Sequence, residues 1–144
     1  MPITIAGSGT ITGISAGGLP DGVITTDDIA ANAVTYAKIG TTEQGQLCKA
    51  WVNFNGTGVV AIRASYNVSS ITDNGTGDYT VNFTTAMPDA NYVVAGMSGT
   101  PSTADTINDF VASTGPAAGS VRFAVRTLGG SSFDATQVHI AVFR

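Results

Sequence analysis

The chain is poor in charge. Charged residues make up 11% of its 144 residues, whereas typical soluble domains contain about 25%. Six basic residues are scattered along a chain whose formal net charge is -4. Nucleic acid and anionic membranes are bound through clustered Lys and Arg side chains, so neither is an expected partner. The sequence has one cysteine, Cys48, which excludes an intrachain disulfide and is interpreted as a small buried side chain.

Long apolar runs are absent as well. No stretch approaches the ~18 apolar residues that a membrane-spanning helix needs. The first residues, "MPITIAGSGTITGIS", have neither the basic region nor the continuous apolar region of a signal peptide. We therefore expect a protein that is made in the cytoplasm, is soluble there and does not insert into a membrane.

Groups for acid–base, nucleophilic or metal chemistry are equally scarce. The single histidine, His139, lacks the ligand spacing of a zinc site, and no G-x-S-x-G motif accompanies it. Most carboxylates lie in expected turns, where aspartate usually shapes the backbone. The sequence thus predicts no enzyme, no catalytic residue, no metal and no cofactor, with His139 at the surface or in an interface. Two alternatives stay open: a polysaccharide depolymerase using paired carboxylates, and calcium in the turn "TDNGTGD" at 72–78.

The N-terminal part, residues 1–46, is predicted to be a stalk or attachment arm. Residues 2–20 show the alternation of short β-segments. A short helix is expected over residues 25–39, with Thr25 as its N-cap and Gly40 just past its end. A helix of about 13 residues is marginal alone in water. It therefore needs a partner surface.

The apolar stripe of this predicted helix consists of Ile29, Ala33, Tyr36 and Ile39. We expect copies of the chain to bury these residues against one another, or against another protein, along a common axis. Docking of the helix on the C-terminal domain is the alternative. No sustained heptad is present, so a coiled coil is not supported.

From residue 47 to residue 144 the pattern is that of β-strands. "LCKAWVNF" at 47–54 alternates, and the later segments at 60–68, 79–83, 92–97, 107–112, 121–128 and 137–143 are similarly strand-like. Turn residues such as "NGTG" at 55–58 separate the segments. Seven or so strands at this spacing predict a mainly β fold, an antiparallel β-sandwich with a jelly-roll-like arrangement.

Trp51 falls out of phase with the apolar residues of its strand and is predicted to point away from the core. An exposed aromatic ring beside amides, here Asn53 and Asn55, suits stacking on a sugar and hydrogen bonding to it. Burial of Trp51 in an interface between chains is the favoured interpretation, because tryptophan is enriched in such interfaces.

Two stretches carry a resemblance to a known family. "GLPDGVITTDDIAANAVTYAKIG" at 18–40 resembles a segment found in bacteriophage tail-fibre and related virion structural proteins. "KAWVNFNGTGVVAIRASYNVSSITDNGTGDYTVNFTTAMPDANYVV" at 49–94 is similar to a domain at the C-terminal end of many phage and prophage tail proteins. The second stretch is the more specific one. The region beyond residue 98 matches less clearly.

The resemblance implies a short homotrimeric fibre on the virion exterior, made in the host cytoplasm, with a β-rich tip at residues 47–144 used in host attachment. The expected partners are its own copies, other virion or tail proteins, and a glycan of the host cell surface. Full tail fibres are usually much longer. A virion subunit that binds no receptor, such as a head fibre, a capsid decoration or a tail adaptor, is therefore the alternative.

Overall fold

The computed structural model describes residues 24–99, 106–110 and 115–144, so the β-segments predicted at 2–20 lie outside the described residues. The chain divides into two compact units, Met1–Ile39 and Gly40–Arg144. The helix α1 (Thr41–Gln46) thus belongs with the second unit, whereas the predicted boundary follows residue 46. One reason is a contact between α1 and the first strand, because Lys49 Nζ donates a hydrogen bond to the Gln44 carbonyl oxygen.

The single helix predicted over residues 25–39 is wrong. The structure has two separate 3-10 helices there, η1 (Thr26–Asp28) and η2 (Tyr36–Lys38). Between them Asn32 adopts a φ of 64°, a left-handed conformation that interrupts a right-handed helix. So short a segment has too few intrahelical hydrogen bonds to overcome such an interruption without a packed face.

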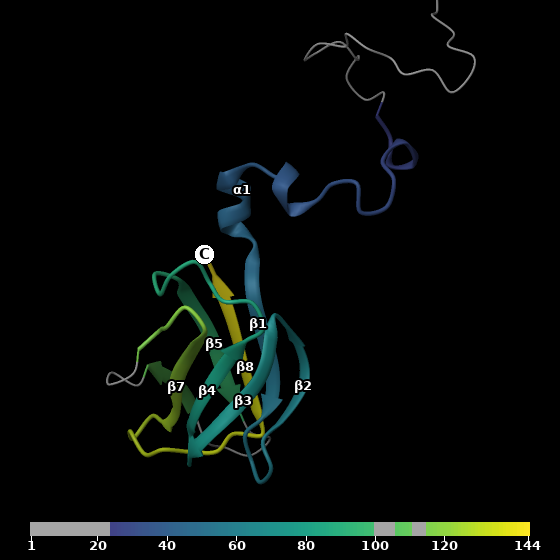
Figure 1. Ribbon diagram of the computed structural model, residues 1–144. Helices are drawn as coiled ribbons and strands as arrows, with labels where there is room; N and C mark the ends of the chain where they lie inside the picture. Colours follow the sequence, from purple (N-terminus) through teal and green to yellow (C-terminus); the bar gives the residue numbers. More distant parts are fainter. Residues whose placement is uncertain (1–23, 100–105, 111–114) are drawn as a thin grey trace, which may run out of the picture. The chain divides into compact units, whose positions relative to one another are not determined.

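An antiparallel β-sandwich makes up the rest of the second unit and confirms the predicted fold class (Figure 1). The described residues form eight strands in two sheets. Their bounds are β1 (Cys48–Asn55), β2 (Ala61–Tyr66), β3 (Val68–Gly75), β4 (Asp78–Phe83), β5 (Val93–Gly99), β6 (Thr106–Phe110), β7 (Ser120–Thr127) and β8 (Gln137–Phe143).

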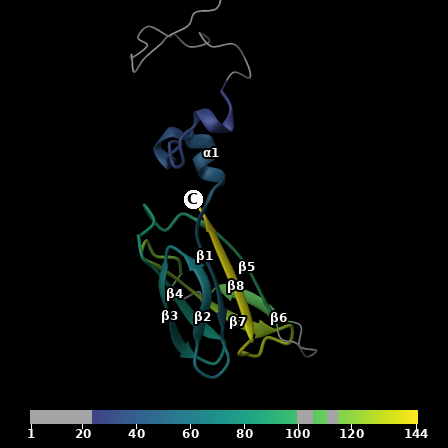
Figure 2. The same cartoon turned by 90° about the vertical axis from the view of Figure 1, so that its right-hand side faces the viewer.

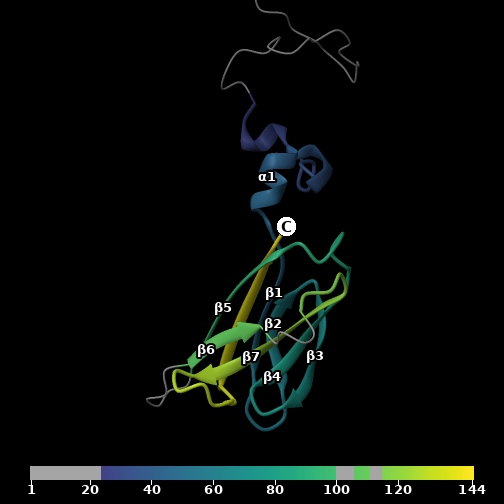
Figure 3. The ribbon, with the colours of Figure 1, turned by 90° about the vertical axis from the view of Figure 1, so that its left-hand side faces the viewer.

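The strand order separates the two layers. Sheet A has the order β2-β1-β8-β5 (Figure 2), and sheet B has the order β3-β4-β7-β6 (Figure 3). Every pairing between these strands is antiparallel. The two hairpins β1–β2 and β3–β4 use the turns predicted at "NGTG" and "TDNGTGD".

The chain crosses from sheet A to sheet B at Asn67. The alternation continues from Val60 to Val68 in the sequence, but the structure ends β2 before Asn67 and starts β3 after it. Asn67 has a φ of 54°, which turns the backbone. Its side-chain amide donates to the carbonyl oxygens of Lys49 (3.1 Å) and Thr85 (3.0 Å). The single strand expected over 60–68 is therefore wrong, because an asparagine stabilised in the left-handed region divides it.

Alternate residues of the central strands form the core between the sheets. In β1 the burial alternates as predicted, with Val52 and Phe54 inside and Trp51 outside. The rings of Phe54 and Tyr79 meet edge to face, with centroids 5.2 Å apart and planes at 74°. Phe123 from β7 completes the cluster, 6.0 Å from Tyr79. These aromatic contacts join sheet A to sheet B.

A buried hydroxyl ties the loop that precedes β8 to the core. The Tyr79 hydroxyl lies 2.7 Å from Asp134 Oδ1 and 2.9 Å from the Gly56 carbonyl oxygen, two acceptors that share its one proton. Asp134 Oδ1 also accepts from the Gly77 amide at 2.6 Å. Burial, together with the hydrogen bond to the Asp134 carboxylate, raises the pKa of Tyr79 well above its ordinary value of 10.0. The phenol is therefore neutral, and the entry into β8 is fixed.

Candidate functional site

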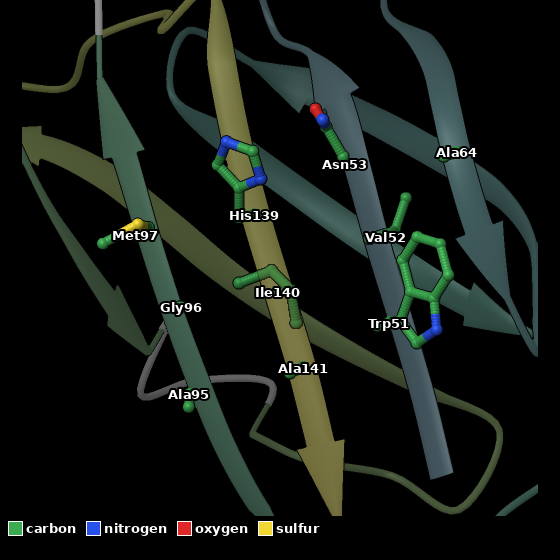
Figure 4. A pocket seen from close by; sticks show the side chains of 10 residues that line it. All are labelled: Trp51, Val52, Asn53, Ala64, Ala95, Gly96, Met97, His139, Ile140 and Ala141. Atoms are coloured by element: carbon green, nitrogen blue, oxygen red, sulfur yellow. The ribbon is translucent and has the colours of Figure 1, made fainter. Parts of the chain in front are cut away.

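An open groove lies on the outer face of sheet A and encloses about 600 Å³. It crosses all four strands of the sheet, and Figure 4 shows the side chains that line it. The lining residues are Trp51, Val52, Asn53, Ala64, Ala95, Gly96, Met97, His139, Ile140 and Ala141. Among them, only Asn53, His139 and the indole N–H of Trp51 supply polar side-chain groups.

The strand register arranges these residues in two rows across the sheet. One row is Tyr66, Trp51, Ala141 and Ala95, from β2 to β5, and it is largely apolar apart from the tyrosine hydroxyl. The other row is Ala64, Asn53, His139 and Met97. In Figure 4, Asn53 lies beside His139 on the neighbouring strand, and Met97 lies across from His139 on β5. Residues in register on antiparallel strands have side chains on one face, so each row is a contiguous surface.

We call this surface the apolar face; beyond the two rows it includes Val93 and Phe143, which are in register next to them. Its large side chains are open to solvent: Trp51 is 40% exposed, Tyr66 59%, Val93 67% and Met97 68%. Single exposed apolar residues are common, but a contiguous group of them marks an interaction site. The apolar face is therefore the candidate functional site.

The electrostatics of the apolar face are simple. None of the ten groove residues has a charged side chain. The Arg63 guanidinium, from the edge strand β2, donates to Asn53 Oδ1 (3.4 Å) and to the Phe54 carbonyl oxygen (3.1 Å). Lys49 on β1 is bonded to α1 as described above. The face thus has cations beside it, and no carboxylate lines its groove.

The outer face of sheet B has the opposite character. On β3, β4 and β7 its side chains include amides, hydroxyls and an ion pair that hydrogen-bond to one another. Asn82 donates to Ser70 Oγ (3.1 Å) and to Thr72 Oγ1 (2.9 Å). Arg122 makes two hydrogen bonds to the Asp78 carboxylate, at 2.8 and 2.6 Å. These contacts depress the pKa of Asp78 below its ordinary value of 3.8, chiefly through the hydrogen bond from Arg122.

In the described part of the chain, neither face carries a cluster of metal-ligating side chains. Across residues 24–99, 106–110 and 115–144, no group of three or more His, Cys, Asp or Glu side chains could hold a metal ion. In the same residues, none of the helices is long and apolar enough to span a membrane. His139, in the groove, has Asn53 and Met97 as its cross-strand neighbours. The exposed apolar side chains of this surface favour contact with another molecule.

The structure brings together two of the three residues predicted for glycan contact. Trp51 and Asn53 both line the groove. Asn55 does not line it, because its side chain closes the following turn. Its Nδ2 donates to the Thr57 carbonyl oxygen (2.7 Å), and its Oδ1 accepts from Thr57 Oγ1 (2.9 Å).

The residues predicted for the oligomer interface fall in both units. Ile29 is 45% exposed, Tyr36 is 53% exposed, Ala33 is exposed and Ile39 is half-buried. These four belong to the first unit and, without a single helix, do not form one stripe. Trp51 belongs to the second unit and lies on the apolar face.

Sequence reasoning did not find Met97, Ala95, Ala141 or Tyr66 as parts of one surface. It did place His139 on the side of its strand opposite Val138, Ile140 and Val142, and these three are buried as expected. Alternation assigns a residue to one side of its own strand. It does not say which strands are neighbours, so no sequence pattern predicted that β1, β2, β5 and β8 together form the groove.

Comparison with known proteins finds no relative of this chain. No family model matches it, and no curated protein or solved structure is significantly similar to it.

Proposed function

We propose that this chain is a structural subunit of a bacteriophage virion, a homotrimeric tail fibre or fibre tip on the virion exterior that attaches to the host surface. The observation that carries the proposal is the apolar face, an exposed and nearly uncharged surface on a compact β-sandwich. A surface of this kind serves contact with another molecule. Among the groove residues His139 is the one acid–base side chain, and no carboxylate lines the groove beside it.

The resemblance to phage tail proteins supports the same proposal. The similar stretch at 49–94 contains most of β1, all of β2, β3 and β4, and the start of β5. Two of the residues that carry the resemblance, Trp51 and Asn53, lie on the groove. The packing of the core does not require a tryptophan at an outward position.

In the proposed mechanism, three copies hold three sandwiches together, and each sandwich contacts a glycan of the host surface. Weak single contacts then combine, because linked sites raise the effective concentration of one another. Other virion proteins would hold the fibre through the N-terminal unit.

A specific observation favours a second candidate, a virion subunit that binds no receptor. Sugars present many hydroxyl groups, whereas the groove offers only the Asn53 amide, the His139 ring and the Trp51 indole N–H as polar side-chain partners. A head fibre, a capsid decoration or a tail adaptor would use the apolar face for assembly alone.

The test is binding of the fluorescently labelled full chain to bacterial cells and to a glycan array. The proposal expects retention on a subset of strains, and loss of binding after the surface polysaccharide is stripped. A chain that forms a stable multimer and binds neither cells nor glycans would favour the second candidate. Release of reducing sugar from polysaccharide would contradict both and identify a depolymerase.

A further inference from the structure

We propose that the apolar face is covered by further copies of this chain, so that the sandwiches of the assembly pack on one another through the outer side of sheet A. This inference rests on the self-assembly in the proposed function. It adds which surface makes the assembly and which residues decide it, and it concerns the C-terminal sandwich instead of the N-terminal segment.

The first argument is the shortage of polar groups. Val52 and Ile140 face the core, and of the other eight groove residues five have apolar side chains or none. The polar groups are the Asn53 amide, the His139 ring and the Trp51 indole N–H, and Asn53 already accepts a hydrogen bond from Arg63. A partner rich in hydroxyl groups would leave most of these unpaired on burial, which costs free energy for each one. A second apolar protein surface meets no such cost.

The second argument is charge. The chain has a formal net charge of -4, so two copies repel each other over most of their surface. The groove contains no carboxylate, and the two cations beside it already make hydrogen bonds to carbonyl oxygens. The apolar face is thus a surface on which identical acidic chains can meet without burying like charges.

The third argument is shape. Ala64, Ala95, Gly96 and Ala141 form a low floor across the sheet, and Trp51 and Met97 stand beside it. Around a threefold axis the apolar face of each copy meets those of both other copies, so tall side chains of one copy lie against low parts of the next. A tryptophan and a methionine from one copy can fill the low floor of the next. Small and large residues on the same face therefore suit packing against a copy of itself.

The experiment compares two variants of the full chain whose substituted residues lie on different surfaces but are equally exposed. Met97 lies on the apolar face, whereas Leu128 lies in the turn after β7, and each side chain is 68% exposed. Met97→Glu adds one carboxylate to the apolar face, and Leu128→Glu adds the same group elsewhere. Neither residue belongs to the buried core, so both variants should fold, which circular dichroism checks.

Light scattering at several concentrations gives the result. We expect a mass near three times 14.5 kDa for the wild type and for Leu128→Glu. For Met97→Glu we expect the mass to fall toward that of one chain, with a dissociation constant raised by ~100-fold or more, because assembly would bury an unpaired carboxylate. A folded Met97→Glu that keeps the multimeric mass overturns the inference, as does a wild type that stays monomeric.

The single tryptophan of the chain, Trp51, reports on the same surface without any substitution. In an isolated sandwich its ring is 40% exposed, so its fluorescence should shift to longer wavelength on dilution, at the concentration where the mass falls. A monomer whose Trp51 emission responds only to added oligosaccharide would assign the face to a glycan and overturn the inference. Binding of cells by a chain that assembles through another surface would leave the proposed function standing and reject this inference alone.

Discussion

Both outer faces of the sandwich are formed by antiparallel β-strands, but the outer face of sheet B is polar and that of sheet A is apolar. On sheet B the side chains of Asn82, Ser70 and Thr72 bond to one another, and Arg122 holds Asp78. On sheet A the corresponding positions are occupied by Trp51, Met97 and alanines. A polar face whose groups are paired within the chain is complete in water. A contiguous exposed apolar face marks an interaction site, which points to sheet A as the interaction surface.

The largest expected effect on stability comes from a substitution in the core, which supports both sheets. Phe54 is fully buried and packs against Tyr79 and Phe123 of the other sheet. Phe54→Ala should lower the free energy of unfolding by about 3–5 kcal/mol, because a buried aromatic ring leaves a cavity. Urea denaturation measures the loss. If the variant lost less than Tyr79→Phe, the two sheets would not share one core.

The next largest effect on stability is expected in the turn between β3 and β4 of sheet B. Gly77 has a φ of 64°, and a Cβ there would lie 2.6 Å from the Phe133 amide nitrogen. Gly77→Ala should cost more than about 2 kcal/mol, since backbone strain and a clash with main-chain atoms add up.

Gly58 supplies the matched control for this turn. It has a similar φ of 62°, but no atom lies within 4 Å of an added Cβ. Gly58→Ala should therefore cost only the strain of about 1–2 kcal/mol. Equal midpoints of thermal unfolding for the two alanine variants would show that the close contact at Gly77 contributes nothing.

A smaller loss of stability is expected from the buried hydrogen-bond network around Tyr79, which belongs to neither outer face. Tyr79→Phe removes the hydroxyl that lies between Asp134 and Gly56 and should cost about 1–2 kcal/mol, because the Gly56 acceptor loses its hydroxyl partner. Tyr92→Phe is the control, since Tyr92 is only half-buried and bonds to the carbonyl oxygens of Ala117 and Ser120. Its loss should be the smaller of the two in chemical denaturation.

The same tyrosine predicts an alkaline limit. The pKa of Tyr79 is raised in the folded chain above its ordinary value of 10.0, chiefly by burial. The unfolded chain therefore loses the phenol proton first, and the stabilisation that is complete below pH 10 declines as the pH rises further. Tyr79→Phe should flatten this decline in unfolding curves recorded between pH 9 and pH 11. An unchanged slope would mean that other groups cause it.

The smallest effect belongs to the polar face itself. The Asp78–Arg122 pair is partly exposed, with side chains 25% and 30% accessible, and such pairs add little stability. The pKa of Asp78 is lowered by Arg122. The contribution of the pair is therefore present above the ordinary value of 3.8 and disappears as the pH falls through the lower folded value. Asp78→Asn should remove this acid dependence and leave the oligomeric mass unchanged, in contrast to Met97→Glu.

Strand-level features were accessible from the sequence, and contacts between strands were not. The alternation of Val52 and Phe54 with Trp51 correctly predicts which side of β1 is buried. The turns at 55–58 and 72–78 correctly predict two hairpins. The prediction of a helix at 25–39 was wrong. Capping residues fit its ends, but a pattern of apolar residues does not reveal that Asn32 in its middle is left-handed.

The amino-acid sequence was enough to predict the class of fold, the inward and outward sides of its strands, and the scarcity of side chains for acid–base or metal chemistry. The first two follow from local rules, since a period of two and turn residues act within a few positions of the chain. The position of β1 between β2 and β8, which brings Trp51 and Asn53 together with Met97 and His139 on one face, became known from the folded chain. Strand order depends on contacts between residues far apart in the chain, and alternation is the same whichever strands are neighbours.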